Sequence, residues 1–423
     1  MHLVGARGPL TAAKSLAYLE HLSESSSQQT DIFSQHLQRE ERIAGSPLTL
    51  GNRVVLLQDG PATYEAMLQA IARAHDHINL ETYILDADEQ GQRFAKALLS
   101  KQRQGVQVNL IRDSVGTWGT PNEFFQSMAV EGVRVLEFNP VNPLATHMPW
   151  RPNQRDHRKL LIVDGQTAFL GGINISSVYS GGSARSSTSA PNGPDLWRDT
   201  DLELTGPVVG ELQKLFLATW NDQHASPLAQ RDYFPALPAV GVDVVRALGS
   251  EPDEVTGQMY ATLLSAINSA QTTIHLTNAY FAPEAEVLQA LAQAAQRQVE
   301  VILVLPSKAD SWLVMQAGRS HYADLLRAGV KIYERQGVIL HSKTVLIDGV
   351  WAAVGSTNLD WRSVLHNREV NAVVLGGPFG AQVQVMFDQD QTHSIAVSLP
   401  QWQQRPWQQR LGQWFAQLWE YWL

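Results

Sequence analysis

Two short stretches decide the fold of this chain: HRKLLIVDG at residues 157–165 and HSKTVLIDG at residues 341–349. Each begins with a histidine, has a lysine two positions later and ends in an apolar run followed by Asp-Gly. The apolar run predicts a buried β-strand, and the Asp-Gly pair predicts a turn. Because the whole pattern occurs twice, we expect two similar structural units in one chain.

The sequence leading to each stretch also repeats in the same order. Apolar runs alternate with amphipathic helical patterns over residues 54–138, and again over residues 242–333. This alternation is typical of βαβ units around a parallel or mixed sheet. We therefore predict an α/β protein of two similar α/β/α halves, related by a pseudo-twofold axis, with an active site at their interface.

These patterns divide the chain into five segments. They are an N-terminal arm (1–49), a first half (50–225), a linker (226–241), a second half (242–400) and a Trp-rich amphipathic C-terminal helix (401–423). The arm contains polar runs, so we expect exposed helical pieces and a loop there rather than core. Prolines in the linker disfavour a regular element.

The composition excludes several classes of protein. The chain has 423 residues, of which 44% are apolar and 17% charged, so it is expected to be globular rather than disordered. It has no cysteine, which excludes disulfides, thiolate metal sites and thiol nucleophiles. A net charge of −9 disfavours nucleic acid as a partner. With no long apolar run and no signal-peptide pattern, an intracellular protein without a membrane span is expected.

The repeated His and Lys residues suit phosphoryl transfer. Residues i and i+2 of a strand share a face, so a cleft between the halves would receive His157 and Lys159 together with His341 and Lys343. One imidazole can attack phosphorus while the other protonates the leaving alcohol, and the lysines can neutralise the phosphate oxygens. This chemistry requires no metal and no cofactor. Only eight residues of the chain are lysine, which argues against a chance repeat.

Other polar residues recur around the motifs. Asp164 and Asp348 follow the lysines, and we interpret them either as members of the catalytic set or, preferably, as residues that hold a turn. Asn174 and Asn358 come later in each half and are assigned to substrate binding. Ser356 stands where the first half has a glycine, so a phosphate-directed hydroxyl is expected from one half only.

The paired motifs resemble those of the phospholipase D superfamily, whose signature is a duplicated HKD motif. The stretches INLETYIL (78–85), GINISSVYS (172–180) and GSTNLDWRSVLHNREVNAVV (355–374) are similar in particular to short bacterial cardiolipin synthases that lack N-terminal membrane spans. The resemblance implies two phospholipase D-like halves and places a carboxylate close to the histidines at Asp199 and Glu369. A surface position at a strand end is the alternative for both carboxylates.

The resemblance also implies a reaction. One motif histidine, with His157 favoured, forms a covalent phosphatidyl-histidine, and the other acts as general acid and then general base. Phosphatidylglycerol, with phosphatidylethanolamine as a second candidate, would supply the phosphatidyl group, and a glycerol hydroxyl of a second lipid would accept it to give cardiolipin. Water as the acceptor would make the protein a phospholipase D that releases phosphatidic acid. A nuclease and a non-catalytic lipid-binding module are less favoured.

Three further segments have open interpretations. The loop 176–195 is either a lid over the cleft or a surface insertion, and the loops around Trp118 and at 139–151 are expected to form an apolar approach to the cleft. Trp407, Leu411, Trp414, Phe415, Leu418, Tyr421 and Trp422 lie on one face of the C-terminal helix. That face predicts either binding to a membrane surface or packing on the protein itself or on a second copy. We expect a peripheral protein on the cytoplasmic face of the bacterial cell membrane, with an oligomeric state that the sequence leaves open.

Overall fold

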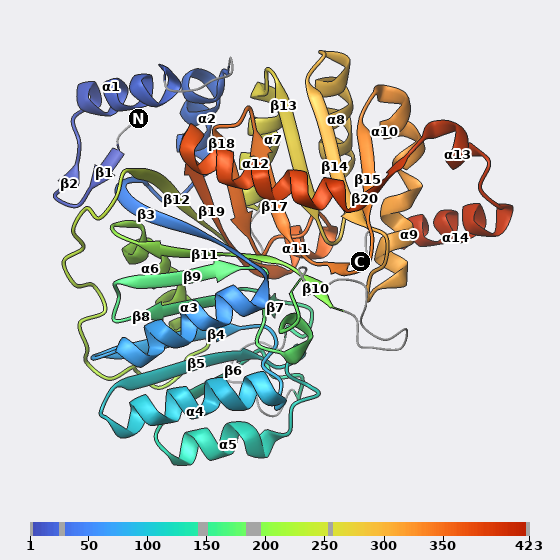
Figure 1. Cartoon of the computed structure of the whole chain (residues 1–423). Coiled ribbons are helices and arrows are strands. Elements are labelled where there is room, and N and C mark those ends of the chain that lie inside the picture. The colour runs from blue at the N-terminus through green and yellow to red at the C-terminus, as the bar shows by residue number, and fades with distance from the viewer. Residues whose placement is uncertain (1–2, 25–29, 143–150, 183–195, 253–256, 420–423) are drawn as a thin grey trace.

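The computed structural model describes residues 3–24, 30–142, 151–182, 196–252 and 257–419. Two α/β halves lie side by side, the first in blue to green and the second in yellow to red (Figure 1). Their strands form one continuous mixed sheet, and helices cover its faces. The predicted fold of two similar halves is confirmed.

The strands of the two halves follow the same order, counted outward from the middle of the sheet. In the first half they are β3 (Leu48–Gln58), β11 (Thr200–Thr205), β9 (Thr167–Gly171), β8 (Leu160–Val163), β4 (His77–Thr82), β5 (Gln107–Asp113) and β6 (Arg134–Phe138). In the second half they are β12 (Asp243–Ser250), β19 (Asn367–Leu375), β18 (Trp351–Gly355), β17 (Lys343–Ile347), β13 (Thr273–Asn278), β14 (Glu300–Pro306) and β15 (Lys331–Arg335), with β20 (Ser394–Val397) at the edge. In each half the three outer strands of this shared order are parallel, and the others are antiparallel.

The two halves join where β3 pairs antiparallel with β12. Leu50 of β3 lies opposite Val244 of β12, so the sheet continues from one half into the other. One cluster of buried residues includes Val54 and Leu204 from the first half together with Val374 from the second. The halves therefore share part of their hydrophobic core, which favours a fixed relative position.

Helices pack on both faces of this sheet. Those of the first half are α3 (Asp59–Arg73), α4 (Glu89–Arg103), α5 (Asn122–Val130) and α6 (Val208–Asp222). Those of the second half are α7 (Gln258–Ser269), α8 (Ala285–Gln296), α9 (Trp312–Ser320), α10 (Tyr322–Ala328), α11 (Trp361–Leu365) and α12 (Gly377–Thr392). Helix α4 shows how local sequence fixes the start of a helix. Asp88 is its N-cap residue and accepts hydrogen bonds from the backbone N–H groups of Gln90 and Gly91, at 3.0 and 3.1 Å.

The N-terminal arm differs from its prediction. It contains β1 (Leu3–Gly5), β2 (Gly8–Pro9), α1 (Ala12–Glu24), the π-helical turn η1 (Ile32–His36) and α2 (Leu37–Ile43). Leu3, Ile32 and Leu37 are buried in the core of the second half, so the expectation of exposed pieces rather than core is wrong. The reason is that isolated apolar residues between polar runs are enough to fix a short arm once a neighbouring core is available.

Two strand pairings between the halves are most important for function, and each includes a strand of only two residues. Strand β7 (Arg155–Asp156), just before the first motif, pairs with β19 of the second half. Strand β16 (Ile339–Leu340), just before the second motif, pairs with β10 (Trp197–Arg198) of the first half. The backbone N–H of His157 then donates to the carbonyl of Arg368 at 2.9 Å, and that of His341 donates to the carbonyl of Arg198 at 2.8 Å. Each motif histidine is thereby held against the opposite half.

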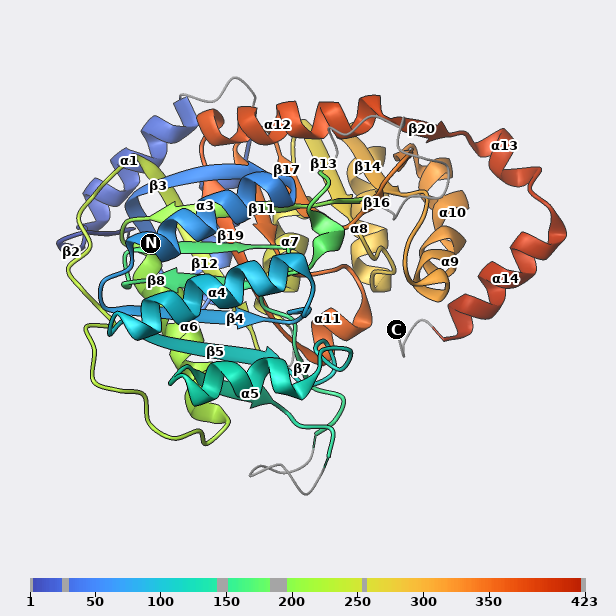
Figure 2. The same ribbon diagram turned by 60° about the horizontal axis from the view of Figure 1, so that its bottom comes forward.

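The C-terminal segment forms α13 (Leu399–Gln403) and α14 (Trp407–Leu418), at the outer edge of the second half beside α9 and α10 (Figure 2). Pro406 precedes the first residue of α14, a position at which a backbone N–H has no partner within the helix, so proline costs no helical hydrogen bond there. Predicted positions Tyr421 and Trp422 lie outside the described residues. Among the described helices, none has both the length and the apolar character needed to cross a membrane.

Candidate active site

Both motif histidines line one cleft between the halves. The cleft encloses about 810 Å³, including space open to solvent. Its lining comes from both halves: Tyr83, Ile84, His157, Asn174, Tyr179, Trp197, Tyr280, Asp310, Ser311, Val314, His341, Asn358, Asp360, Arg362 and Asn367. The predicted location of the site at the interface is therefore confirmed.

His157 is paired with a carboxylate of the other half. Its Nδ1 lies 3.0 Å from both carboxylate oxygens of Glu369, a buried residue near the start of β19. Ser356 donates a hydrogen bond to Glu369, and Asn367 donates to it at 3.3 Å. A carboxylate held in this way fixes the imidazole ring and keeps the proton on Nδ1, so that Nε2 has a lone pair.

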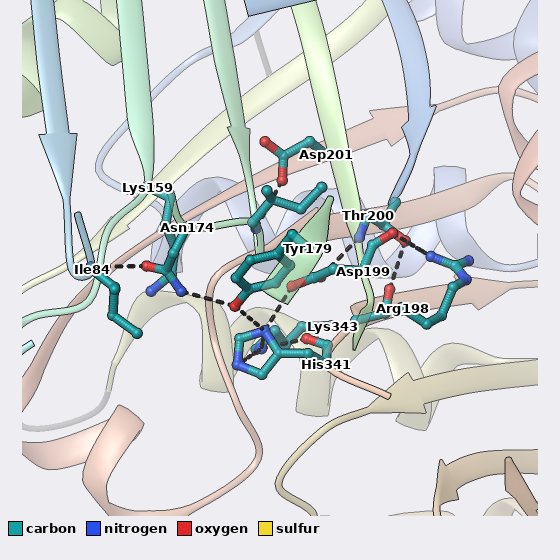
Figure 3. Close-up of polar contacts among 12 residues, drawn as sticks. Ile84, Lys159, Asn174, Tyr179, Arg198, Asp199, Thr200, Asp201, His341 and Lys343 are labelled. Atoms are coloured by element: carbon teal, nitrogen blue, oxygen red, sulfur yellow. Dashed lines mark hydrogen bonds and ion pairs between the residues drawn. The ribbon is translucent and has the colours of Figure 1, made fainter. Parts of the chain in front are cut away.

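His341 has the corresponding partner from the first half. Its Nδ1 lies 2.6 Å from Oδ2 of Asp199, between β10 and β11 (Figure 3). The Tyr179 hydroxyl also lies 3.4 Å from Nδ1, and Asn174 donates to that hydroxyl at 3.0 Å. The structure thus places Asp199 and Glu369 in equivalent positions, each against the histidine of the opposite half.

The two motif lysines are buried beside the histidines. Lys159 donates to the carbonyl oxygen of His157 at 2.6 Å, and the Nζ of Lys343 lies 2.9 Å from Nδ1 and 3.0 Å from Nε2 of His341. Burial lowers the pKa of Lys159 to about 7 and that of Lys343 to about 8. Each ammonium group is therefore poorly solvated and gains by contact with an anion.

The same burial acts on the acids and bases of the site. Burial, reinforced by the charges of Lys159 and Lys343, holds the pKa of His157 well below its usual range. The pKa of His341 is also lowered, mainly by burial and then by Lys343, but the Asp199 carboxylate opposes this change. Burial raises the pKa of Glu369 to about 7. A neutral His157 suits a nucleophile, and the contact of His341 with the Asp199 carboxylate suits a residue that exchanges a proton.

Asp164 and Asp348 lie in the turns after the motif strands. Asp164 accepts hydrogen bonds from the backbone N–H groups of His75, Asp76 and His77 at 2.8 to 3.0 Å. Asp348 accepts corresponding bonds from residues 271–273, at 2.8 to 3.2 Å. Both have positive φ, of 53° and 50° respectively. These contacts are those of turn-holding residues, and the structure does not bring either carboxylate to the histidines.

Three of the predicted substrate-binding residues, Asn174, Asn358 and Ser356, differ in their contacts. The Asn174 side chain already has hydrogen-bond partners within the protein: its oxygen accepts from the backbone N–H of Ile84 at 3.1 Å, and its nitrogen donates to the Tyr179 hydroxyl. Asn358 also lines the cleft, and its buried Oδ1 has no hydrogen-bond partner within the described part of the chain. Ser356 is turned toward Glu369 rather than toward a phosphate position. Binding of substrate by all three stays a prediction.

Several cleft residues were not found from the sequence. Around His341 the rings of Trp197, Tyr179 and Tyr280 lie at centroid distances of 5.0, 6.0 and 6.2 Å. Around His157, Tyr83 lies at 5.1 Å and Arg362 lines the same cleft. Tyr83 and Tyr280 lie in the repeated stretches 78–85 and 274–281, and Tyr179 and Trp197 stand within a few residues of Asn174 and Asp199, but neither signal indicates the direction of a side chain.

The described part of the loop 176–195 gives Tyr179 its position. Residues Ser177–Tyr179 form a single 3₁₀ turn, in which the backbone N–H of Ser177 donates to the Asp88 carboxylate and that of Val178 donates to the Ser176 hydroxyl. Residues 183–195 and 143–150 lie outside the described residues. A lid role for the first loop, and an apolar approach formed by the second, therefore stay predictions.

Comparisons with known proteins agree with this fold and site. A phosphatidylserine synthase from Haemophilus influenzae Rd KW20 has a similar structure, with a TM-score of 0.67 at 14% identity, covering 92% of this chain and 100% of that one. The family model described as cardiolipin synthase, PLD-like domain, matches twice, at residues 67–180 and 263–391. The fold and the twofold match to a PLD-like domain identify the chain as a member of the phospholipase D superfamily.

Relatives that match in sequence indicate a more specific family within this superfamily. A cardiolipin synthase of Geobacillus kaustophilus (strain HTA426) is 34% identical over 380 residues, covering 88% of this chain and 72% of the relative. One of Listeria monocytogenes (serotype 4b, strain CLIP80459) is 35% identical over 335 residues, covering 78% and 67%. The chain belongs to the cardiolipin synthase family of phospholipase D-like proteins, and the predicted family is confirmed.

Proposed function

We propose that the protein is a phosphatidyltransferase of cardiolipin synthase type that acts on phosphatidylglycerol through a covalent phosphatidyl-histidine. The observation that carries this proposal is the pair of buried His–carboxylate contacts, His157 with Glu369 and His341 with Asp199, in one cleft. Two equivalent imidazoles with different surroundings provide a nucleophile and an acid for one phosphodiester.

In the first step, Nε2 of His157 attacks the phosphorus of phosphatidylglycerol. A P–N bond forms, and the bond from phosphorus to the head-group oxygen breaks. His341 transfers its proton to that oxygen, so that glycerol leaves. The ammonium groups of Lys159 and Lys343 stabilise the negative charge on the phosphoryl oxygens, and the low polarity of their surroundings strengthens this interaction.

The second step reverses these roles. The now neutral His341 takes a proton from a glycerol hydroxyl of a second phosphatidylglycerol, whose oxygen attacks phosphorus while the P–N bond breaks. The product is cardiolipin, and both histidines return to their starting states. Water in place of the lipid hydroxyl gives phosphatidic acid, so transferase and hydrolase differ only in the acceptor.

Product analysis tests the proposal. Incubation with phosphatidylglycerol alone should give cardiolipin and glycerol in equal amounts, with little phosphatidic acid. Phosphatidylethanolamine, alone and mixed with phosphatidylglycerol, shows whether it serves as a second donor. Phosphatidic acid as the main product would make the protein a hydrolase, and DNA cleavage without lipid turnover would favour a nuclease.

Both histidines should be required. His157→Ala and His341→Ala should each lower turnover by about 10³-fold or more, because nucleophile and acid act in series. The exposed side chain of His393, whose Nδ1 contacts the carbonyl oxygen of Gln389, provides a control, and His393→Ala should keep normal turnover.

Turnover should also persist in EDTA, since lysines rather than a metal are proposed to stabilise the phosphate. Position on the cytoplasmic face of the cell membrane stays a prediction that cell fractionation can test.

A further inference from the structure

Two exposed tryptophans occupy equivalent places in the two halves. Trp118 follows β5, and Trp312 begins α9 after β14; β5 and β14 have the same position in their parts of the sheet. The side chain of Trp118 is 73% exposed and that of Trp312 is 54% exposed. Large exposed apolar side chains at symmetric positions need an explanation beyond chance exposure.

Both tryptophans adjoin the cleft. In the loop of Trp118, a Cβ on Gly116 would lie 2.1 Å from the carbonyl oxygen of Tyr83, so this loop packs directly on a residue that lines the cleft. Trp312 lies between Ser311 and Val314, which line the cleft from the second half. Each half thus contributes one exposed tryptophan next to residues that line the cleft.

Helix α14 extends this apolar surface from Trp312. A Cβ on Gly412 would lie 3.4 Å from the Trp312 ring, and Gln413 and Ala416 are buried, so α14 packs on α9 through its small and polar face. The opposite face is exposed and includes Leu411, Trp414, Phe415 and Leu418, with Trp407 at the start of the helix also exposed. The helix lies against the second half beside α9 (Figure 2), and its large apolar side chains are exposed.

We propose that these residues form a surface that seats the cleft on a lipid bilayer. We call it the tryptophan rim, and it consists of Trp118, Trp312, Leu411, Trp414, Phe415 and Leu418. The proposal rests on the proposed function, because a lipid substrate has to reach the cleft. Withdrawing acyl chains into water is costly in free energy, so the enzyme is expected to take the head group at the bilayer surface.

A bilayer fits this surface better than a protein partner. Tryptophan is favoured where apolar rings meet lipid head groups. A second copy seated on the rim would cover the opening through which a lipid has to enter. The net charge of −9 gives no general attraction to an anionic membrane, so binding has to depend on apolar insertion and should survive high salt.

A triple variant tests the rim on vesicles of phosphatidylglycerol and phosphatidylethanolamine. Trp118→Ser, Leu411→Ser and Trp414→Ser together should weaken co-sedimentation by at least about tenfold, because three apolar side chains no longer leave water. The matched control replaces exposed apolar residues elsewhere, Val130→Ser, Val385→Ser and Ile395→Ser, and should bind as the wild type does. Equal vesicle binding by the triple variant and the control would overturn the proposal.

A second measurement does not depend on the variant's stability. The chain has no cysteine, so Leu411→Cys can be labelled alone with a polarity-sensitive dye, with Val385→Cys as the control. Vesicles should shift the emission of the dye at position 411 to the blue and leave that at 385 unchanged. Equal spectra at the two positions, or a shift at 411 caused by self-association without vesicles, would overturn membrane docking.

Short-chain phosphatidylglycerol, dissolved as monomers, separates docking from catalysis. The double variant Leu411→Ser and Trp414→Ser, which leaves Trp118 unchanged, should turn over this substrate at the wild-type rate, because α14 contributes no residue to the lining of the cleft. Wild-type vesicle binding that depends on the rim, without turnover of either substrate, would disprove the proposed function and leave the docking surface supported. A double variant that is folded but slow on the monomeric substrate would count against a role in docking alone.

Discussion

At the scale of single residues, the two histidines are alike in sequence but differ in their surroundings. Glu369 is held by Ser356, whereas Asp199 faces Gly172, at which a Cβ would lie only 2.2 Å from the carboxylate. The glycine therefore provides the space that Asp199 needs to reach His341. The Gly-to-Ser difference between the repeats, predicted to direct a hydroxyl at phosphate, instead accompanies two different carboxylate contacts.

The carboxylates should act through the histidines. Asp199→Asn and Glu369→Gln should each lower kcat by about 10² to 10⁴-fold, because an amide does not favour the required imidazole tautomer or stabilise its protonated form. Thermal unfolding should show that both variants remain folded. Glu203→Gln changes a partly exposed carboxylate of β11 and serves as the control. Normal kcat in either site variant would contradict the paired arrangement.

The lysines should determine the alkaline limit of activity. Lys159, with a pKa lowered to about 7, and Lys343, with a pKa lowered to about 8, lose their positive charge as the pH rises through these values. The phosphoryl oxygens then lose their partners, so kcat/KM should fall across this range. Lys159→Arg keeps its charge at all these pH values and should move the fall to higher pH. A kcat/KM that stays constant through alkaline pH would show that these lysines do not set the limit.

At the scale of elements, the HKD motif combines two physical tasks. Its histidine lines the cleft and its lysine lies buried beside that histidine, while its aspartate holds the turn after β8 or β17 by binding the backbone of the loop that leads into β4 or β13. A backbone with positive φ favours Asp or Asn at these positions. The motif is therefore a structural unit as well as a chemical one.

Loss of the turn contact should affect stability rather than chemistry. Asp348→Ala leaves the backbone N–H groups of Gln271, Thr272 and Thr273 without their acceptor and should lower the free energy of unfolding by about 2 to 4 kcal/mol. Asp348→Asn should cost less, since Asn accepts a hydrogen bond and tolerates positive φ. Denaturant unfolding measures both. A folded Asp348→Ala protein with normal stability and no turnover would instead favour direct catalysis.

At the scale of the whole molecule, neither half has a complete site. His157 needs Glu369 from the second half, and His341 needs Asp199 from the first. The β3–β12 contact makes the sheet continuous, so separating the halves would also expose two long strand edges. The internal repeat therefore has a functional consequence: each half completes the other.

A fragment containing only the first half should be inactive. Residues 50–241 retain His157 and Lys159 but lack His341, Lys343 and Glu369. We expect no lipid turnover and a strong tendency to aggregate through the edge of β3. Light scattering and product analysis measure these outcomes, with the full chain as the control. A soluble, monomeric fragment that turns over phosphatidylglycerol would contradict a site built from both halves.

Much of this architecture could be predicted from periodic patterns. The α/β class, the repeated halves and the two His–Lys pairs follow from runs of residues long enough to show a strand or helix period. The strands β7, β10 and β16 are only two residues long, which is too short for any pattern. The positions of Tyr179 and Trp197 beside His341 could not be predicted, because they depend on these short strands and on one 3₁₀ turn.

The sequence by itself determined the repeat, the fold class and the residue types that carry the chemistry, since these depend on local patterns and their spacing. Only the tertiary structure decided which carboxylate serves which histidine, that Asp164 and Asp348 hold turns rather than join the catalytic set, and that α14 packs on α9. These features depend on contacts between residues far apart in the chain. Such contacts are set by the packing of the two halves, and no local periodicity records them.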